Sequence, residues 1–598
     1  MERKTALVGC YGVDRMEARY YYSGLRDCRA MALFFGGATS CEIGCLGGGT
    51  CVSVCPFNAI RMRDDRLPEI DTSICRGCGR CVDVCPKGVI SLCGMTDRMF
   101  HLNENSECLA PCRQKCPAQV NIPLFIRLLV KNEMSSALLT IKERNPFPLS
   151  IGRTCPHICE NICRRNLADQ GIAVNHLARY LGEWERNSEK HIPVPCAPDT
   201  DKKVAIIGGG PAGLSCAYFL RRAGHRPVIF EAKSQLGGML RYGIPEYRLP
   251  KKVVDWEIEG VLELGVEART KIQFGRDFDL EGLEEKGFEA VFLGLGAWTV
   301  PHLGIPGETA TNVYGSLEFL SQVNRVLRDL KNKRVVVVGE SNTAMDCARS
   351  SIRLGADSVT VICPCDRKDM SARNRDVDRA LDEGVIIHFM SIPVSLLSNQ
   401  ADGVQGLTYC RSMDNSEEPE KHTCTGEIES SPIRLKADLI ISAYDRKPDL
   451  TCFSEGENDK SSFKITQNGT LGAERFSQLA AKPNIFTAGD LHTGRATVIG
   501  AVAGARLAAR SMHYLMTDGA IPLAANIQRR VNPKSILKTV LVSTELPKIT
   551  IPELPVAMRC QSFVEEVIDT IDYTQASTEA KRCLQCGTYC YDKYVVRH

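Results

Sequence analysis

One pattern of cysteines constrains this 598-residue chain more than any other feature. Residues 75–86 read C-R-G-C-G-R-C-V-D-V-C-P, and residues 41–56 read C-E-I-G-C-L-G-G-G-T-C-V-S-V-C-P. The first is the C-x2-C-x2-C-x3-C-P run of two-cluster ferredoxins, whose fourth cysteine ligates the other cluster. The pattern predicts two [4Fe–4S] clusters, with a structural zinc site as the alternative. The predicted ligands are Cys75, Cys78, Cys81 and Cys55 for one cluster, and Cys41, Cys45, Cys51 and Cys85 for the other.

The composition agrees with metal ligation inside a cell. The chain has 29 cysteines, and regular cysteine spacings without a secretory signal favour metal ligands over disulfides. No apolar run is long enough to span a bilayer, and a charged segment follows Met1, so we expect a soluble, cytoplasmic protein without membrane contact. A net charge of +3 without a basic stripe predicts no nucleic-acid partner.

The first cysteine zone carries a resemblance. Residues 22–37 read Y-S-G-L-R-D-C-R-A-M-A-L-F-F-G-G, and the cysteine run from Cys41 follows them. Together they are similar to the ferredoxin part of the B subunit of Rnf-type ferredoxin:NAD oxidoreductases, over about residues 4–95. The membrane segment of that subunit has no counterpart here, so membrane attachment is not expected. Cys10, Cys28 and Cys93 are expected to be packing residues.

A second cysteine zone reads C-L-A-P-C-R-Q-K-C-P at residues 108–117 and C-P-H-I-C-E-N-I-C at residues 155–163. Cysteines one helical turn apart place their thiolates on one face, which suits a cluster or a zinc ion. The zone resembles the amino-terminal domain of the small (β) subunit of NADPH-dependent glutamate synthase, and of its relatives in bifurcating transhydrogenases and dihydropyrimidine dehydrogenase. The resemblance implies two further [4Fe–4S] clusters, with ligands among Cys108, Cys112, Cys116, Cys155, Cys159 and Cys163.

The chain departs from this family pattern in the placement of one motif. The family motif E-A-x-R-C-L-x-C-G normally precedes the A-P-C sequence, but here it occurs at residues 579–587. One hypothesis is that the tail folds back, so that Cys583 and Cys586 supply the missing ligands. The alternative is a separate or vestigial site that includes Cys590.

A second departure is Ala178, which stands where the family has a Glu or Gln ligand. The cluster expected on Cys116, Cys155 and Cys159 therefore uses another fourth ligand or is absent.

A first dinucleotide loop follows a buried strand at residues 204–207. The loop has the G-x-G-x-x-G pattern that suits a tight turn, pyrophosphate approach and close packing of helix on strand. Glu231 ends the next strand, where a carboxylate can accept hydrogen bonds from ribose hydroxyls. By resemblance, L-G-G-M-L-R-Y-G-I-P at residues 236–245 and I-F-T-A-G-D-L at residues 485–491 are FAD motifs, and Asp490 should bond the ribityl chain. The predicted FAD residues are Gly208, Gly210, Gly213, Glu231, Gly237, Gly238, Gly489 and Asp490.

A second loop, R-V-V-V-V-G-E-S-N-T-A at residues 334–344, lies where the family binds NADP(H). Gly339 and Ser341 occupy the first two glycine positions, and Glu340 between them places negative charge near an anionic ligand. The family's Tyr-Arg-Arg is missing, but Arg367 and Arg373 (and Lys368) are candidates to pair with a 2′-phosphate. We favour NADP(H) over NAD(H), with a degraded nucleotide site as the alternative. The Cys363-Pro-Cys365 sequence is expected to be structural.

The parts predict an α/β and α+β multidomain chain with two nested Rossmann-like domains. Hydride carries two electrons and a cluster takes one, so FAD must stand between them. No acid–base pair or nucleophile stands out, and no catalytic side chain is predicted. The predicted divisions are a ferredoxin-like domain at 1–100, a helical iron–sulfur domain at 101–198, an FAD-binding domain at 199–325 and 451–516, an NAD(P)-binding domain at 326–450 and a C-terminal extension at 517–598.

The favoured function is an NAD(P)H oxidoreductase subunit of a multisubunit complex similar to electron-bifurcating NADH-dependent ferredoxin:NADP oxidoreductases. Its expected partners are ferredoxin, a nicotinamide nucleotide and other redox subunits. Two alternatives stay open, which are a glutamate synthase small subunit serving an amidotransferase chain and a wiring subunit whose nucleotide site has decayed.

Overall fold

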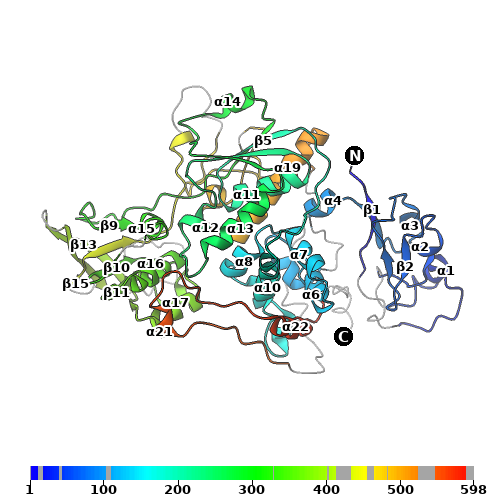
Figure 1. The fold of residues 1–598 in the computed structure, drawn as a ribbon, viewed down its shortest axis with the longest axis horizontal. Helices are drawn as coiled ribbons and strands as arrows, with labels where there is room; N and C mark the ends of the chain where they lie inside the picture. The colour runs from blue at the N-terminus through cyan, green and yellow to red at the C-terminus, as the bar shows by residue number, and fades with distance from the viewer. Residues whose placement is uncertain are drawn as a thin grey trace.

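The parts of the chain lie in a row (Figure 1). The cysteine-rich N-terminal part (blue) is at one end and the second parallel sheet (light green) is at the other, with the helical part and the first sheet between them. Within the described residues, no helix is both long enough and apolar enough to cross a membrane. The computed structural model describes residues 2–10, 18–39, 44–102, 109–326, 329–399, 403–411, 432–453, 463–480, 482–522 and 546–586.

The N-terminal part consists of two similar halves. Each half has a glycine in the left-handed conformation, Gly49 with φ 76° and Gly79 with φ 81°, directly before a one-turn helix that carries a cysteine. Glycine suits these positions because it has no Cβ to clash. The elements are α1 (Cys28–Leu33), α2 (Thr50–Ser53) and α3 (Arg80–Asp83), with β1 (Thr5–Val8) antiparallel to β4 (Ile90–Cys93) and β2 (Ile60–Met62) antiparallel to β3 (Pro68–Ile70).

The helical part contains short helices and one helix from the far end of the chain. The connecting helix α4 (Met95–Phe100) leads into it from the N-terminal part. The C-terminal helix α22 (Tyr573–Lys581) packs against α6 and α10, so the tail does fold back onto this part. The other elements are α5 (Pro111–Lys115), α6 (Ile122–Val130), α7 (Met134–Lys142), α8 (Pro148–Thr154), α9 (Ile158–Asn161), η1 (Arg164–Leu167) and α10 (Val174–Asn187).

The first large sheet has five parallel strands in the order β17-β8-β5-β6-β7. Helices α11 and α19 pack against each other beside it. The strands are β5 (Lys203–Ile207), β6 (Arg226–Glu231), β7 (Glu267–Thr270), β8 (Ala290–Leu293) and β17 (Ile485–Thr487), and the helices are α11 (Pro211–Arg222), α12 (Met239–Tyr242), α13 (Lys251–Leu262), α14 (Leu280–Glu285), α18 (Asp490–Thr493) and α19 (Val498–Asp518).

The second sheet is inserted between β8 and β17, so the two sheets are nested as the sequence predicts. It is also parallel, with the order β12-β11-β10-β16-β9. A three-stranded antiparallel sheet, β13-β14-β15, adjoins it. The elements are β9 (Val313–Gly315), α15 (Ser316–Val323), β10 (Arg334–Val338), α16 (Asn342–Arg353), β11 (Ser358–Ile362), η2 (Arg367–Asp369), α17 (Asn374–Asp382), β12 (Ile386–His388), β13 (Ser391–Asn399), β14 (Gly403–Arg411), β15 (Ile433–Lys436), β16 (Leu439–Ser442), η3 (Thr451–Phe453) and α21 (Val556–Arg559).

Strand β9 belongs to this second sheet, although it precedes the boundary expected at residue 325. The glycine loop after β10 marks the start of the nucleotide motif. The edge strand β9 comes before that loop, has only three residues and pairs with β16. The structure therefore begins the second sheet before its glycine loop.

A buried cluster of charges holds α16 to the end of α17. Glu383 accepts hydrogen bonds from Arg349 (2.8 and 2.9 Å) and from Arg353 (2.6 and 2.9 Å). Burial opposes ionisation of Glu383, but the hydrogen bonds from Arg353 and Arg349 hold its pKa at about 2. The guanidinium of Arg353 also lies 3.9 Å from the ring centroid of Tyr247, a residue before α13.

We predict that Glu383→Gln lowers the free energy of unfolding of this part by about 3–5 kcal/mol, because two buried guanidinium groups lose their shared carboxylate. Because the folded pKa lies below the ordinary 4.5, the stabilisation is present above that pH and is lost as pH falls toward 2. Urea unfolding followed by circular dichroism measures the change. Glu267→Gln, which removes an exposed partner of Arg269, is the control, and equal effects of the two substitutions would contradict the prediction.

Candidate functional site

Four of the predicted ligands surround one cavity in the N-terminal part. Cys55, Cys75, Cys78 and Cys81 line it together, as the crossed assignment requires. Backbone N–H groups point at two of the sulfurs, from Ala6 to Cys75 Sγ (3.4 Å) and from Ala59 to Cys55 Sγ (3.4 Å). Such hydrogen bonds to sulfur accompany iron–sulfur ligation and tune its potential, so the donors present fit a [4Fe–4S] cluster.

A second cavity holds the other crossed group. Cys45, Cys51 and Cys85 line it, and Cys41 lies outside the described residues. Burial raises the pKa of Cys45 to about 12 and that of Cys51 to about 11, so both need a bound metal to stay as thiolates. Cys28, which the sequence suggests is a packing residue, lines the same cavity as these three predicted ligands.

The tail brings two cysteines to the helical part. Burial raises the pKa of Cys112 well above its usual range, and Cys583, Cys159, Cys586 and Cys163 are close enough to add to this effect. Cys583 is in turn affected by Cys586 and Cys163. The tail therefore brings Cys583 and Cys586 near Cys112 and Cys163, and their role as ligands of one cluster stays a prediction. Cys108 and Cys590 lie outside the described residues.

Two buried side chains of the tail motif, Glu579 and Arg582, attach it to the helical part. Glu579 accepts from the backbone N–H of Ala173 (2.8 Å) and from Arg582 (2.8 Å). Arg582 also donates to Asp169 (3.1 Å) and to the carbonyl of Gln170 (2.7 Å). These bonds fix the end of α22 onto the loop before α10, which sets Cys583 beside the helical part.

The remaining cysteines of the helical part, Cys116, Cys155 and Cys159, form a second group. Burial raises the pKa of Cys116, whereas the backbone N–H groups of residues 118–120 and the guanidinium of Arg506 oppose that rise. The methyl side chain of Ala178 offers no donor atom.

The carboxylate nearest to this group, Glu160, is already engaged. It accepts from the backbone N–H of Asn175 (3.0 Å) and pairs with His157 (3.1 Å) and Lys548 (3.5 Å). The three cysteines suit a cluster whose fourth ligand differs from the one that the family uses. No described residue is identified as that fourth ligand.

The first glycine loop forms a close turn between β5 and α11. Gly208 has φ 103°, and a Cβ there would lie 2.4 Å from the carbonyl oxygen of Gly294. A Cβ on Gly213 would lie 1.8 Å from the carbonyl oxygen of Gly208, so both positions exclude a side chain. Gly210 precedes the first residue of α11 and leaves the helix N-terminus accessible to an anion.

Glu231 and Asp490 stand at either side of this turn. Glu231 accepts from the backbone N–H groups of Gly209 (2.7 Å) and Lys233 (2.7 Å), and burial raises its pKa. Asp490 accepts from Ala496 N–H (3.1 Å) and lies 3.7 Å from Arg446, a partner that the sequence did not indicate. Gly237, Gly238 and Gly489 all have positive φ, and a Cβ on Gly238 would lie 2.7 Å from the Cα of Gly210.

The second loop differs from the first in its polar contacts. Gly339 has φ 150°, and a Cβ there would lie 2.6 Å from the carbonyl oxygen of Ala443. The Ser341 hydroxyl caps α16 by accepting from Ala344 N–H (3.4 Å). Cys365 donates to the Glu340 carboxylate (3.0 Å), and its sulfur lies 3.7 Å from that of Cys363, so the unusual loop residue and the Cys-Pro-Cys sequence contact each other.

Both candidate phosphate-binding arginines have protein partners. Arg367 pairs with Asp378. Arg373 lies 3.2 Å from Asp376 and donates to the carbonyl of Cys155 (3.3 Å), so it links the second sheet to the helical cysteine group. Their role at a 2′-phosphate stays a prediction.

The profile of the pyridine nucleotide-disulphide oxidoreductase family matches residues 202–506, which cover both parallel sheets and half of the chain. The chain belongs to this family. Further matches are dihydropyrimidine dehydrogenase domain II, 4Fe-4S cluster, at residues 94–190 and a 4Fe-4S dicluster domain at residues 41–89.

Members of this family with known roles resemble most of the chain. The NADP(+)-dependent formate dehydrogenase subunit beta of Moorella thermoacetica is 30% identical over 508 residues, covering 80% of this chain and 70% of that protein. The glutamate synthase [NADPH] small chain of Escherichia coli (strain K12) is 31% identical over 414 residues, covering 67% and 87%. Among solved structures, FprA of Mycobacterium tuberculosis in complex with NADPH gives a TM-score of 0.45 at 16% identity, covering 54% of this chain and 86% of FprA.

These findings confirm the predicted family, fold class and cofactor classes. This pyridine nucleotide-disulphide oxidoreductase combines an FAD/NADP-binding part with two 4Fe–4S ferredoxin domains. The assignment of individual cysteines as ligands stays a prediction.

We predict that Cys583→Ser removes about four iron atoms per chain, because one [4Fe–4S] cluster loses a ligand. Cys112→Ser and Cys163→Ser should cause the same loss, and the double variant Cys112→Ser/Cys583→Ser should lose no more than either single variant. Iron and sulfide analysis of the anaerobically purified protein measures this.

Cys560→Ser is the matched control, since Cys560 is in the tail but is predicted to ligate nothing. Additive losses in the double variant would mean that the tail cysteines form a separate site.

Proposed function

We propose that this chain is the FAD- and NADP(H)-handling subunit of a cytoplasmic multisubunit redox complex. When bound, FAD would supply two-electron exchange with NADPH, and the [4Fe–4S] clusters would supply one-electron transfer to ferredoxin or to another redox subunit. The reverse direction uses the same parts. The protein's own contribution is to bind the nucleotide, exclude water and fix the separation of the electron carriers.

One observation carries this proposal. Helix α19 begins beside the FAD motif and reaches the Cys116 group. Its first turn is capped by Thr497, just after Asp490 of the FAD motif. About two turns later Arg506 donates to the carbonyl of Met99 (3.0 Å) and affects the pKa of Cys116. A rigid helix therefore sets the distance between the flavin motif and the Cys116 group.

The charge of Arg506 has a function in this route. The residue is 2% exposed and its pKa is lowered well below the usual value by burial. A buried cation close to a sulfur ligand stabilises the reduced state of the cluster held by that ligand, because the reduced state carries more negative charge. Arg506 thus favours electron arrival at the Cys116 group.

The role in a complex rests on the relatives. One is named as a subunit of NADP(+)-dependent formate dehydrogenase and another as the small chain of glutamate synthase, so each works with another chain. We infer that this chain likewise supplies a catalytic partner with electrons, or receives them from it. The N-terminal two-cluster part, matched as a 4Fe-4S dicluster domain at residues 41–89, favours a redox partner over an amidotransferase.

An anaerobic titration of the cluster-loaded chain with NADPH, and separately with NADH, tests the proposal. We expect stoichiometric NADPH to bleach the flavin and then to produce cluster signals in electron paramagnetic resonance. If dithionite reduces the flavin and neither nucleotide does, the nucleotide site is not functional in this chain and the wiring-subunit alternative replaces the proposal.

We predict that Glu340→Gln lowers the Kd for NADP+ by a factor of about 2–5, because it removes a negative charge at the N-terminus of α16. The substituted amide retains an acceptor for the Cys365 thiol. Fluorescence quenching of the oxidised protein with NADP+ gives the Kd. Glu318→Gln, an exposed change on α15, is the control, and an unchanged Kd in Glu340→Gln would place the phosphates elsewhere.

A further inference from the structure

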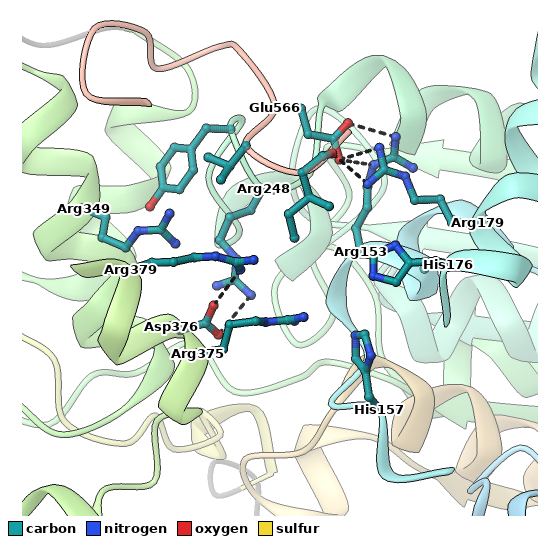
Figure 2. A pocket seen from close by; sticks show the side chains of 14 residues that line it. Arg153, His157, His176, Arg179, Arg248, Arg349, Arg375, Asp376, Arg379 and Glu566 are labelled. Atoms are coloured by element: carbon teal, nitrogen blue, oxygen red, sulfur yellow. Dashed lines mark hydrogen bonds and ion pairs between the residues drawn. The ribbon is translucent and has the colours of Figure 1, made fainter. Parts of the chain in front are cut away.

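A cavity lies where the helical part, the second sheet and the C-terminal tail meet (Figure 2). Its walls come from α8 to α10, from the loop before α13, from α16 and α17, and from residues 566–568 of the tail. None of the predicted nucleotide-loop residues lines it, and neither Arg367 nor Arg373 does.

Six arginines line this cavity, against two carboxylates. Five of the six arginines are paired with carboxylates at the wall or behind it. Arg153 donates to Glu566 (2.8 and 3.0 Å), and Arg248 donates to Asp346 (2.5 and 2.6 Å). The complete set is Arg153, Arg179, Arg248, Arg349, Arg375 and Arg379.

Three polar groups in the cavity have unused donor capacity. Nδ1 of His176 and Nε of Arg179 have no hydrogen-bond partner among the described residues, and these residues are only 7% and 3% exposed. The Arg179 guanidinium is otherwise engaged, because it pairs with Glu566 (3.1 Å) and Glu183 (3.9 Å) and donates to the carbonyl of Ile568 (2.9 Å). Within the same described part of the chain, Arg375 forms no ion pair or hydrogen bond. Figure 2 shows Arg375 extending from α17 toward His157 and His176, across the space between the two walls.

Burial and neighbouring charges both act on the titratable groups of the cavity. The pKa of His176 is lowered to about 3 by burial and by the nearby charges of His157, Arg179 and Arg375, against the opposing effect of Glu160. The pKa of Arg179 is lowered to about 10 by burial and by Arg153, against Glu566 and Glu183. Burial is the larger cause of both shifts and disfavours a buried anion as well, so the case for an anion rests on the unpaired Arg375 and on Nδ1 of His176.

We propose that this cavity binds a phosphoryl oxyanion, either inorganic phosphate or the phosphate of a small ester. Arg375 and His176 are its principal donors, approaching from two different walls. A tetrahedral oxyanion offers acceptors in several directions, and the arginine fork matches two of them at once. A bound phosphate would join α17 of the second sheet to α10 of the helical part, beneath the tail residue Glu566.

Isothermal titration calorimetry of the full, cofactor-loaded chain with inorganic phosphate tests this. The ionic strength is held constant with chloride, and NADP+ is kept saturating so that the nucleotide site is filled. We expect saturable binding that Arg375→Gln weakens about tenfold or more, because a charge-assisted hydrogen bond is lost. Arg276→Gln, which removes the same charge at an exposed position, should leave the Kd unchanged.

The alternative is that the arginines only hold the parts of the chain together. In that case phosphate shows no saturable binding, or both substitutions weaken it equally, and either result overturns the proposal. Arg375→Lys adds a second variant, which should keep part of the affinity because the charge remains and the fork is lost. Repeating the titration with ribose 5-phosphate identifies the source, since tighter binding than phosphate indicates an ester and weaker binding indicates the free anion.

Discussion

A single hydrophobic core joins the helical cysteine region to the first parallel sheet. Phe100 and Leu177 on the helical side share it with Phe219 and Val502 on α11 and α19, and Ala576 of the tail belongs to it as well. Protein interiors are close-packed and deform little, so a continuous core fixes separations across it. The flavin motif and the cysteine groups of the helical part are therefore held as one body, whereas the second sheet has a core of its own.

The electrostatics follow from this burial. Thiols in the core have raised pKa values, and the nearby cations Arg506 and Arg373 partly offset that effect at Cys116 and Cys155. Each cation is anchored by backbone carbonyl groups, at Met99 and at Cys155. The chain thus places positive charge next to sulfur without relying on mobile surface groups, which makes the local potential insensitive to salt.

The sequence predicts much of this arrangement because local chemistry sets it. Gly208 and Gly213 sit where any Cβ would clash, and the crossed cysteine runs allow few three-dimensional solutions. The tail motif that begins at Glu579 is recognisable because its residue spacing matches the family motif, although the motif occurs at a different place in this chain. By contrast, Arg446, Arg506 and the lining of the basic cavity come together only through tertiary packing of distant segments, and no local pattern marks them.

The docking of the tail has a consequence for the way the protein matures. Both parallel sheets lie between Cys163 and Cys583 in the sequence, yet these two cysteines belong to one predicted group. A ribosome must therefore synthesise the whole dinucleotide-binding region before the group can close, and contacts of such long sequence separation form late. Insertion of iron and sulfide at this group would then act as a final check, because only a chain that has folded both sheets and returned α22 to the helical part can retain them.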